Sequence, residues 1–143
     1  KQLHLVCVLK GGAYFMIELA KYITVPVVID FMSVSSYGSG TTSAGRVKIL
    51  KDLDEPVQGK DVLIVEDIVD SGRTLSCLKT MFESREPASL SICTLLDKPS
   101  RREVEVDVEY VGFEIPDAFV VGCGLDFDQK YRNFPYVGVV EFE

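Results

Sequence analysis

The chain has 143 residues, of which 47% are hydrophobic and 26% are charged, and its formal net charge is −7. This length and apolar content predict one folded domain, spanning residues 1–143, and exclude a disordered chain. The acidic balance argues against nucleic acid as a partner, because phosphate backbones are bound by dense Lys and Arg. A local phosphate pocket is compatible with it, since backbone N–H groups and a divalent cation can neutralise phosphate.

The chain carries four widely spaced cysteines without a CxxC pair, which is typical of proteins in a reducing cytoplasm. We find no signal-peptide pattern and no apolar run long enough to cross a bilayer, so we expect no membrane partner. The first apolar run begins at Leu3 with no preceding cap or loop, so we expect that an upstream segment is missing.

Short apolar runs rich in β-branched residues predict strands, and most of them lack the polar alternation of a half-exposed strand. Helical periodicity appears between the runs, at 13–22 and 74–84. This alternation predicts an α/β fold, with a mostly parallel open sheet and flanking helices. The predicted strands are 3–9, 25–34, 62–65, 90–96, 119–122 and 136–142.

Two segments depart from the alternation. Residues 35–45 hold three glycines and many hydroxyl side chains, with no aliphatic residue larger than alanine. Such a segment cannot anchor itself by packing, so we expect a mobile loop, either a solvated hairpin tip or a flap over an active site. Residues 97–110 mix charges with Pro99 and indicate a connection followed by an irregular edge.

The stretch 62–75 reads VLIVEDIVDSGRTL and places three acids directly after a buried strand. In an open α/β sheet, ligands bind beyond the carboxyl ends of the strands, where Glu66 and Asp67 are expected. Neighbouring side chains on an extended chain point to opposite faces, so these two acids are not expected to chelate one ion together at short range. One acid can bind hydroxyl groups while the other reaches Mg²⁺, which takes oxygen ligands and retains several waters.

The turn 70–74 follows and leads into the helix that we expect to begin near Leu75. Successive N–H groups before a helix N-terminus form a cradle for an anion, and the hydroxyls and the helix dipole add to it. Gly72 permits a close approach of the backbone. Asp70 can alternatively be an N-cap carboxylate, but the strand and acid pair before it favour the functional interpretation.

Residues 62–75 resemble the phosphoribosyl-diphosphate (PRPP) motif of type I phosphoribosyltransferases: an apolar strand, two acids, two apolar residues and then D-[S/T]-G-x-T. Other segments resemble hypoxanthine-guanine phosphoribosyltransferases, and most of all the bacterial, hypoxanthine-preferring branch. In chain order these are VLKGG (8–12), SSYG (35–38), LLDKP (95–99), VGFEIPDAFVVG (111–122) and LDFDQKYRN (125–133). The resemblance implies that family's fold, with a small hood from the C-terminal part. It also implies that the N-terminal segment of the family's hood is missing.

The activity that the resemblance implies is a Mg²⁺-dependent step of purine salvage. Phosphoribosyl would pass from PRPP to N9 of hypoxanthine, and also of guanine, to give IMP or GMP and pyrophosphate. The implied protein is a cytoplasmic transferase that binds PRPP and a 6-oxopurine and assembles as a homodimer or homotetramer.

Roles on the PRPP side carry over position by position. Glu66 and Asp67 match the acids that hold the ribose hydroxyls and Mg²⁺, and Asp70 matches the catalytic residue near purine N7. The 5′-phosphate cradle is matched by Ser71, Gly72, Arg73 and Thr74. Pyrophosphate binding is matched by Lys10, Gly11 and Arg132, with a Lys10–Gly11 peptide that can be cis in the family.

On the purine side, Lys98 matches the lysine that donates to the 6-oxo group. A donor there selects 6-oxopurines over adenine, because the 6-amino group cannot accept that hydrogen bond. Phe119 matches the ring that stacks on the base, and Val120 matches a residue with backbone contacts to it. Leu125 matches the residue whose carbonyl accepts from an exocyclic amine.

Asp126 matches a second metal position, and Ser36 and Tyr37 match the family's closing flap, which favours the lid interpretation. Ala118 stands where the family often has Lys, and Cys123 where it often has Tyr, so the preference among hypoxanthine, guanine and xanthine stays open. The alternatives are a superfamily enzyme for another base, a non-catalytic regulator that binds RNA or PRPP, and an unrelated α/β receiver domain.

Overall fold

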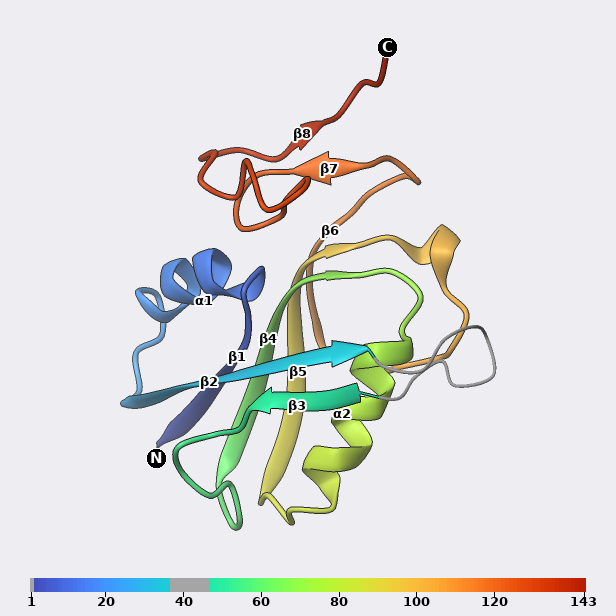
Figure 1. Ribbon diagram of the computed structural model, residues 1–143. Coiled ribbons are helices and arrows are strands. Elements are labelled where there is room, and N and C mark those ends of the chain that lie inside the picture. Colours follow the sequence, from blue (N-terminus) through green and yellow to red (C-terminus); the bar gives the residue numbers. More distant parts are fainter. Residues whose placement is uncertain (1, 37–46) are drawn as a thin grey trace.

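The computed structural model describes residues 2–36 and 47–143 (Figure 1). Its main sheet has six strands in the order β3-β2-β1-β4-β5-β6. Every neighbouring pair in this sheet is parallel except β2 with β3, so the mostly parallel α/β prediction is confirmed. The strands are β1 (Leu3–Leu9), β2 (Val27–Ser36), β3 (Val47–Lys51), β4 (Asp61–Val69), β5 (Ser89–Asp97) and β6 (Tyr110–Glu114).

Helices α1 (Gly12–Ala20) and α2 (Arg73–Glu83) pack on the two faces of this sheet. Alternation along β1 explains the division, because Leu5 and Cys7 pack with Met16 of α1, whereas Val6 and Val8 belong to the cluster that contains α2. Both helices lie within two residues of their predicted positions. In the described part of the chain, no helix has the length and apolar character needed to span a membrane.

Several elements differ from the prediction. Strands β3 and β6 were not predicted: β3 is a largely exposed antiparallel edge, and β6 begins at the last residue of the segment 97–110 and has only exposed side chains. A short 3₁₀ helix, η2 (Pro99–Arg101), precedes β6. The two C-terminal strands are much shorter than predicted and pair antiparallel in a sheet of their own, as β7 (Val120–Val121) and β8 (Gly138–Val139).

The small β7–β8 sheet lies beyond the carboxyl ends of β4 and β5 (Figure 1). A separate apolar cluster joins it to the main sheet, in which Leu96 of β5 packs with Val120 and Leu125. The C-terminal part therefore stands over the sheet edge where the sequence places the site.

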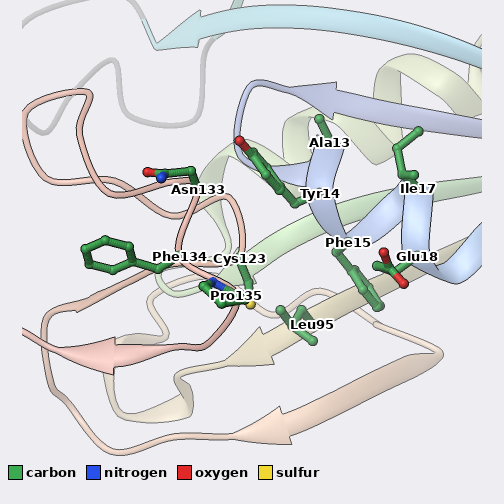
Figure 2. Close-up of a pocket in the computed structure, with 10 residues that line it drawn as sticks. All are labelled: Ala13, Tyr14, Phe15, Ile17, Glu18, Leu95, Cys123, Asn133, Phe134 and Pro135. Atoms are coloured by element: carbon green, nitrogen blue, oxygen red, sulfur yellow. The ribbon is translucent and has the colours of Figure 1, made fainter.

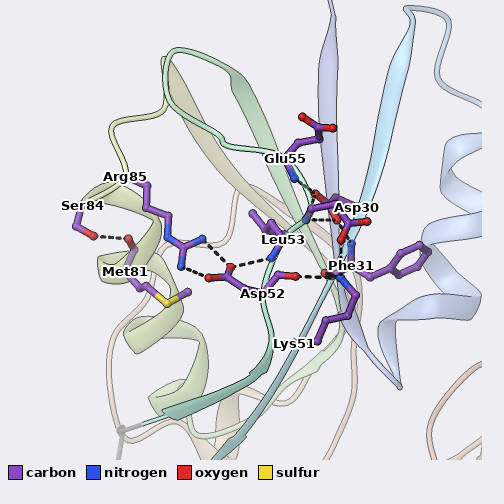
Figure 3. A network of polar contacts seen from close by, with 10 residues as sticks. Asp30, Phe31, Lys51, Asp52, Leu53, Glu55, Met81, Ser84 and Arg85 are labelled. Carbon is purple, nitrogen blue, oxygen red and sulfur yellow. Dashed lines mark hydrogen bonds and ion pairs between the residues drawn. The ribbon is translucent and has the colours of Figure 1, made fainter.

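A polar network holds the base of the β2–β3 hairpin (Figure 3). Asp30 of β2 is 5% exposed, and its carboxylate accepts from the N–H groups of Asp54 and Glu55 at 2.9–3.1 Å. The guanidinium of Arg85, just after α2, donates two hydrogen bonds to Asp52 at 2.8 and 2.9 Å and lowers the pKa of that carboxyl. The segment after β3 is thereby tied to both β2 and the end of α2.

Candidate active site

The acid pair lies within β4 and not beyond its end. β4 continues to Val69, and Ile68 and Val69 pair with Leu96 and Asp97 of β5. The prediction that the strand ends before Glu66 is therefore wrong, because the pairing of β4 with β5 continues past both acids to Val69. The two carboxylates are nevertheless part of the carboxyl end of the sheet.

Asp67 lies against the turn between β1 and α1. A Cβ added to Gly11 would lie 1.9 Å from Oδ2 of Asp67, so only glycine allows the carboxylate this close to the turn. Asp67 thus points to the face that carries α1. Alternation of neighbouring side chains along a strand predicts that Glu66 points to the opposite face.

The acids repel one another in a partly buried setting. Burial raises the pKa of Glu66 well above its usual value, and the charges of Asp67 and Asp70 raise it further. Burial also raises the pKa of Asp67, against the opposing effects of the Ile68 N–H group and of Arg132. A site with excess negative charge and too little compensation favours a bound cation or hydroxyl donors.

The turn after β4 has the form of an anion cradle. Gly72 adopts the left-handed conformation, with φ at 82°, and is the N-cap of α2, without a side-chain cap. The N-cap interpretation of Asp70 is therefore wrong: its exposed carboxylate accepts from the Ser71 N–H group at 2.7 Å. The first intrahelical bond runs from Ser76 N to Gly72 O, which leaves the N–H groups of the first turn of α2 without helical partners.

A second turn and the C-terminal loop meet beside Asp67. A Cβ on Gly124, whose φ is +100°, would lie 2.1 Å from the carbonyl oxygen of Gly11, so the two backbones are in direct contact. Arg132 Nη1 donates to Gly124 O at 2.6 Å. The side-chain oxygen of Gln129 accepts from Lys10 Nζ and from Arg132 Nη2, both at 3.2 Å, which brings the two predicted pyrophosphate cations together.

The β1–α1 turn contains a cis peptide bond, but it joins Leu9 to Lys10. The expected position, Lys10–Gly11, is therefore wrong by one residue.

The predicted base-selecting lysine lies next to Asp70. The backbone N–H of Lys98 donates to Val69 O at 2.9 Å, which holds the start of η2 against the end of β4. Phe119 is 46% exposed and makes edge-to-face contacts with Phe127 and Phe142, at centroid distances of 5.6 and 6.0 Å. An exposed aromatic ring that is held in place by edge-to-face contacts with other rings is a suitable platform for a planar ligand.

The other predicted purine contacts lie behind this ring. Val120 and Leu125 are buried, and the carbonyl of Leu125 accepts from the Gly122 N–H group at 2.9 Å. A carbonyl oxygen has two lone pairs, so one acceptor position is left for a ligand amine.

The predicted metal ligands do not form a protein-only cage. Among the described residues, no group of three or more His, Cys, Asp and Glu side chains is placed to hold a metal ion. Asp126 accepts from Gln129 N at 2.9 Å and lies 3.5 Å from Arg132 Nη2, and its charge helps to raise the pKa of Asp67. One or two carboxylates with water and substrate oxygens suit Mg²⁺, so the donor set fits this ion.

Comparison with known proteins identifies the family. The phosphoribosyl transferase domain model matches residues 1–128. A hypoxanthine phosphoribosyltransferase of Salmonella typhimurium is 62% identical over 136 residues, which cover 95% of this chain and 76% of that protein. The chain belongs to the hypoxanthine phosphoribosyltransferase family. A hypoxanthine-guanine phosphoribosyltransferase of Streptococcus thermophilus is 55% identical over a match that covers 97% of this chain and 77% of that protein.

The solved structures agree with this family. A crystal structure of hypoxanthine phosphoribosyltransferase from Staphylococcus aureus superposes with a TM-score of 0.95 at 51% identity, over 99% of this chain and 77% of that one. In the present chain, the segments that carry the predicted PRPP, pyrophosphate and purine residues lie at one edge of the sheet. Ser36 is the last residue of β2 and pairs with Val47, whereas Tyr37 lies outside the described residues.

Three residues of the site were missed from the sequence. Gly124 contacts Gly11, Gln129 joins Lys10 to Arg132, and Arg102 binds the carbonyl of Asp70. The repeated glycine in VGCGL was a usable signal for the first, because spaced glycines mark close backbone approach. Neither link could be found from local sequence, since Gln129 joins nearby Arg132 to distant Lys10, and Arg102 joins nearby Asp97 to distant Asp70.

A pocket formed by described residues is separate from this site. It has a volume of about 800 Å³ and lies between α1 and the C-terminal segment (Figure 2). Tyr14, Phe15 and Ile17 line one side, and Cys123 and Phe134 line the other. No residue of the predicted PRPP, purine or metal sets lines it, so its apolar volume belongs to a different surface.

Proposed function

We propose that this chain transfers the phosphoribosyl group of PRPP to N9 of hypoxanthine, and also of guanine, and releases pyrophosphate. One observation carries the proposal: the acid pair of β4, the start of α2 and the turn at Gly11 meet at one edge of the sheet, beside Lys98. The named activities of relatives that are 62% and 55% identical support it.

The turn 70–74 is suited to the 5′-phosphate of PRPP. The first N–H groups of α2 have no helical partners, and the positive end of the helix dipole adds to them. Ser71 and Thr74 add hydroxyl groups. The guanidinium of Arg73 is bound to Glu103 at 2.5 Å, so we expect Arg73 to contact the phosphate through its backbone N–H, which donates to Ser71 Oγ at 3.3 Å in this structure.

Glu66 and Asp67 are proposed to bind the ribose hydroxyls of PRPP. Burial raises the pKa values of both acids, and nearby carboxylates add to this, Asp67 and Asp70 for Glu66 and Asp126 for Asp67, so hydroxyl donors are favourable partners for them. Mg²⁺ would be held by one of these acids directly or through water, and Asp126 would reach a second metal position, with water and PRPP oxygens completing the coordination. When bound, the ion supplies positive charge that stabilises the leaving diphosphate.

The leaving diphosphate is proposed to bind at Lys10, Gly11 and Arg132. The two cations already lie side by side on Gln129, so little reorganisation is needed when negative charge develops on the diphosphate. Water competes with the purine for the ribose carbon, so closure of a lid has a chemical purpose. We propose that Ser36 and Tyr37 belong to this lid.

The purine is proposed to lie on Phe119, with its 6-oxo group accepting from Lys98. Val120 and Leu125 would contribute backbone contacts, the carbonyl of Leu125 to the exocyclic amine of guanine. Asp70 is exposed and follows directly on Val69, whose carbonyl binds the Lys98 N–H group. Asp70 can therefore approach N7 of a purine that Lys98 holds, as proton acceptor or electrostatic partner.

Two broader properties are proposed from the family. We propose that the chain acts in the cytoplasm and assembles as a homodimer or homotetramer. Size measurement by light scattering tests the assembly, and a monomer at micromolar concentration would contradict it.

The function is tested with PRPP, Mg²⁺ and each of hypoxanthine, guanine, xanthine and adenine, by following nucleotide formation. We expect IMP and GMP to form and AMP not to form, because adenine has no 6-oxo acceptor for Lys98. A failure to form nucleotide with any base rejects the function. Adenine as the preferred base rejects the role of Lys98 alone.

A further inference from the structure

The side chain of Arg102 joins two loops of the proposed site. Its Nε donates to the backbone carbonyl of Asp70 at 3.0 Å, and its Nη2 donates to a carboxylate oxygen of Asp97. The side chains of Arg102 and Asp97 are only 17% and 15% exposed. Two hydrogen bonds from one guanidinium, at a site this well shielded from solvent, are stronger and more directional than a surface ion pair.

The two residues that Arg102 holds are neighbours of residues with proposed functional roles. Asp70 begins the phosphate turn and faces the base. Asp97 directly precedes Lys98, whose backbone N–H is bonded to Val69 O at 2.9 Å. One guanidinium therefore connects the loop that binds PRPP to the loop that selects the purine.

The residues after Arg102 support the same turn. The backbone N–H groups of Glu103 and Val104 both donate to Ser71 O, at 2.9 and 3.0 Å. A Cβ on Gly72 would lie 2.4 Å from Val104 O and 3.1 Å from Arg102 Cδ, so the segment packs directly on the turn. The anion cradle is thus backed by this segment, and Arg102 is its one side-chain link to Asp97 among the hydrogen bonds of the described residues.

We propose that Arg102 is a positioning residue that fixes the phosphate turn relative to Lys98. This inference rests on the proposed function and adds to it a residue that touches neither substrate. Its effect is on binding, because a turn and a lysine that are free to shift separately hold PRPP and the purine less well. Lysine is a poor replacement, since one ammonium cannot reproduce the two-point fork.

The test compares Arg102→Gln and Arg102→Lys with Arg101→Gln. Arg101 is the adjacent arginine, 60% exposed and 3.7 Å from Asp117, and serves as the matched control. We expect the KM values for PRPP and hypoxanthine each to rise roughly tenfold in Arg102→Gln, and less in Arg102→Lys. The Arg101 variant is expected to keep both KM values.

Direct PRPP binding, measured by calorimetry on protein confirmed as folded by circular dichroism, separates positioning from a loss of folding. A merely structural role lowers the folded fraction and leaves KM and the PRPP Kd of the folded protein unchanged, which would overturn the inference. We also expect Arg102→Gln with Asp97→Asn to be no worse than the poorer single variant, because both remove the same contact. Additive losses would overturn it, whereas an inactive wild type rejects the proposed function instead.

Discussion

The contact between Gly124 and Gly11 gives the sharpest single perturbation of the site, Gly124→Ala. The added Cβ would lie 2.1 Å from Gly11 O, where ordinary contact begins at 3.4 Å, and both groups in the clash are backbone. Relief requires one of the two loops to move by roughly 1 Å. Because Asp67 and Arg132 are held at the same place, that movement separates the acid from the cation.

The expected loss of stability has two parts. Alanine in the left-handed region costs about 1–2 kcal/mol, and overpacking adds about 1–3 kcal/mol. Gly59→Ala is the matched control, because Gly59 has a φ of +71° but its added Cβ would meet nothing within 4 Å. The control therefore carries the backbone cost without the clash.

Urea denaturation and initial rates with PRPP are the assays for both variants. We expect Gly124→Ala to be less stable than Gly59→Ala by about 2 kcal/mol and to raise the KM for PRPP roughly tenfold or more. Gly59→Ala is expected to keep the wild-type KM. Equal stability losses with unchanged KM in both variants would refute the claim that the two loops depend on this contact.

Three further predictions concern the acids and the lysine. Asp70→Asn is expected to lower turnover roughly 100-fold with little change in PRPP affinity, and equal losses in both would reject a transition-state role. Lys98→Met is expected to raise the KM for hypoxanthine roughly tenfold and to weaken discrimination against adenine; an unchanged ratio of the two rates contradicts this. Because the pKa of Glu66 is raised, the folded chain binds its proton more tightly than the unfolded chain, and stability falls as pH rises above the usual pKa of glutamate. Urea titrations across that range should show a slope that Glu66→Gln removes, and persistence of the slope in the variant would contradict its assignment.

The buried elements could be predicted from the sequence, because their apolar runs have no other stable arrangement. β1 was predicted to the residue, and both helices follow from their periodic apolar faces. β3 and β6 were missed, since each is a five-residue edge strand whose side chains are mostly exposed, so burial does not mark them out in the sequence. A local pattern of apolar residues reveals a strand whose side chains are buried, and the side chains of these two edge strands are mostly exposed.

The same limit applies to the site. The acids and the phosphate turn lie within one stretch of chain, so their order in sequence is also their order in space. The full length of β4 could not be predicted, because its last residues include two acids. Acids within a buried strand are tolerated only where a functional site requires them. One of the two contacts of Gln129 reaches 119 positions along the chain, and one of those of Arg102 reaches 32, and no short-range pattern encodes such contacts.

The arrangement of charge in the site suits a ligand that carries both hydroxyl donors and an anionic diphosphate. On one side, Glu66 and Asp67 have raised pKa values and too few donors; on the other, Lys10 and Arg132 share one neutral acceptor, Gln129. The neutral amide of Gln129 holds Lys10 without cancelling its charge, whereas the charge of Arg132 is partly offset by Asp126 at 3.5 Å. PRPP presents hydroxyl groups and a Mg²⁺-binding diphosphate together, so one ligand can satisfy both halves of the site. In the proposed function, the free protein is therefore electrostatically incomplete, and binding energy is concentrated where the diphosphate leaves.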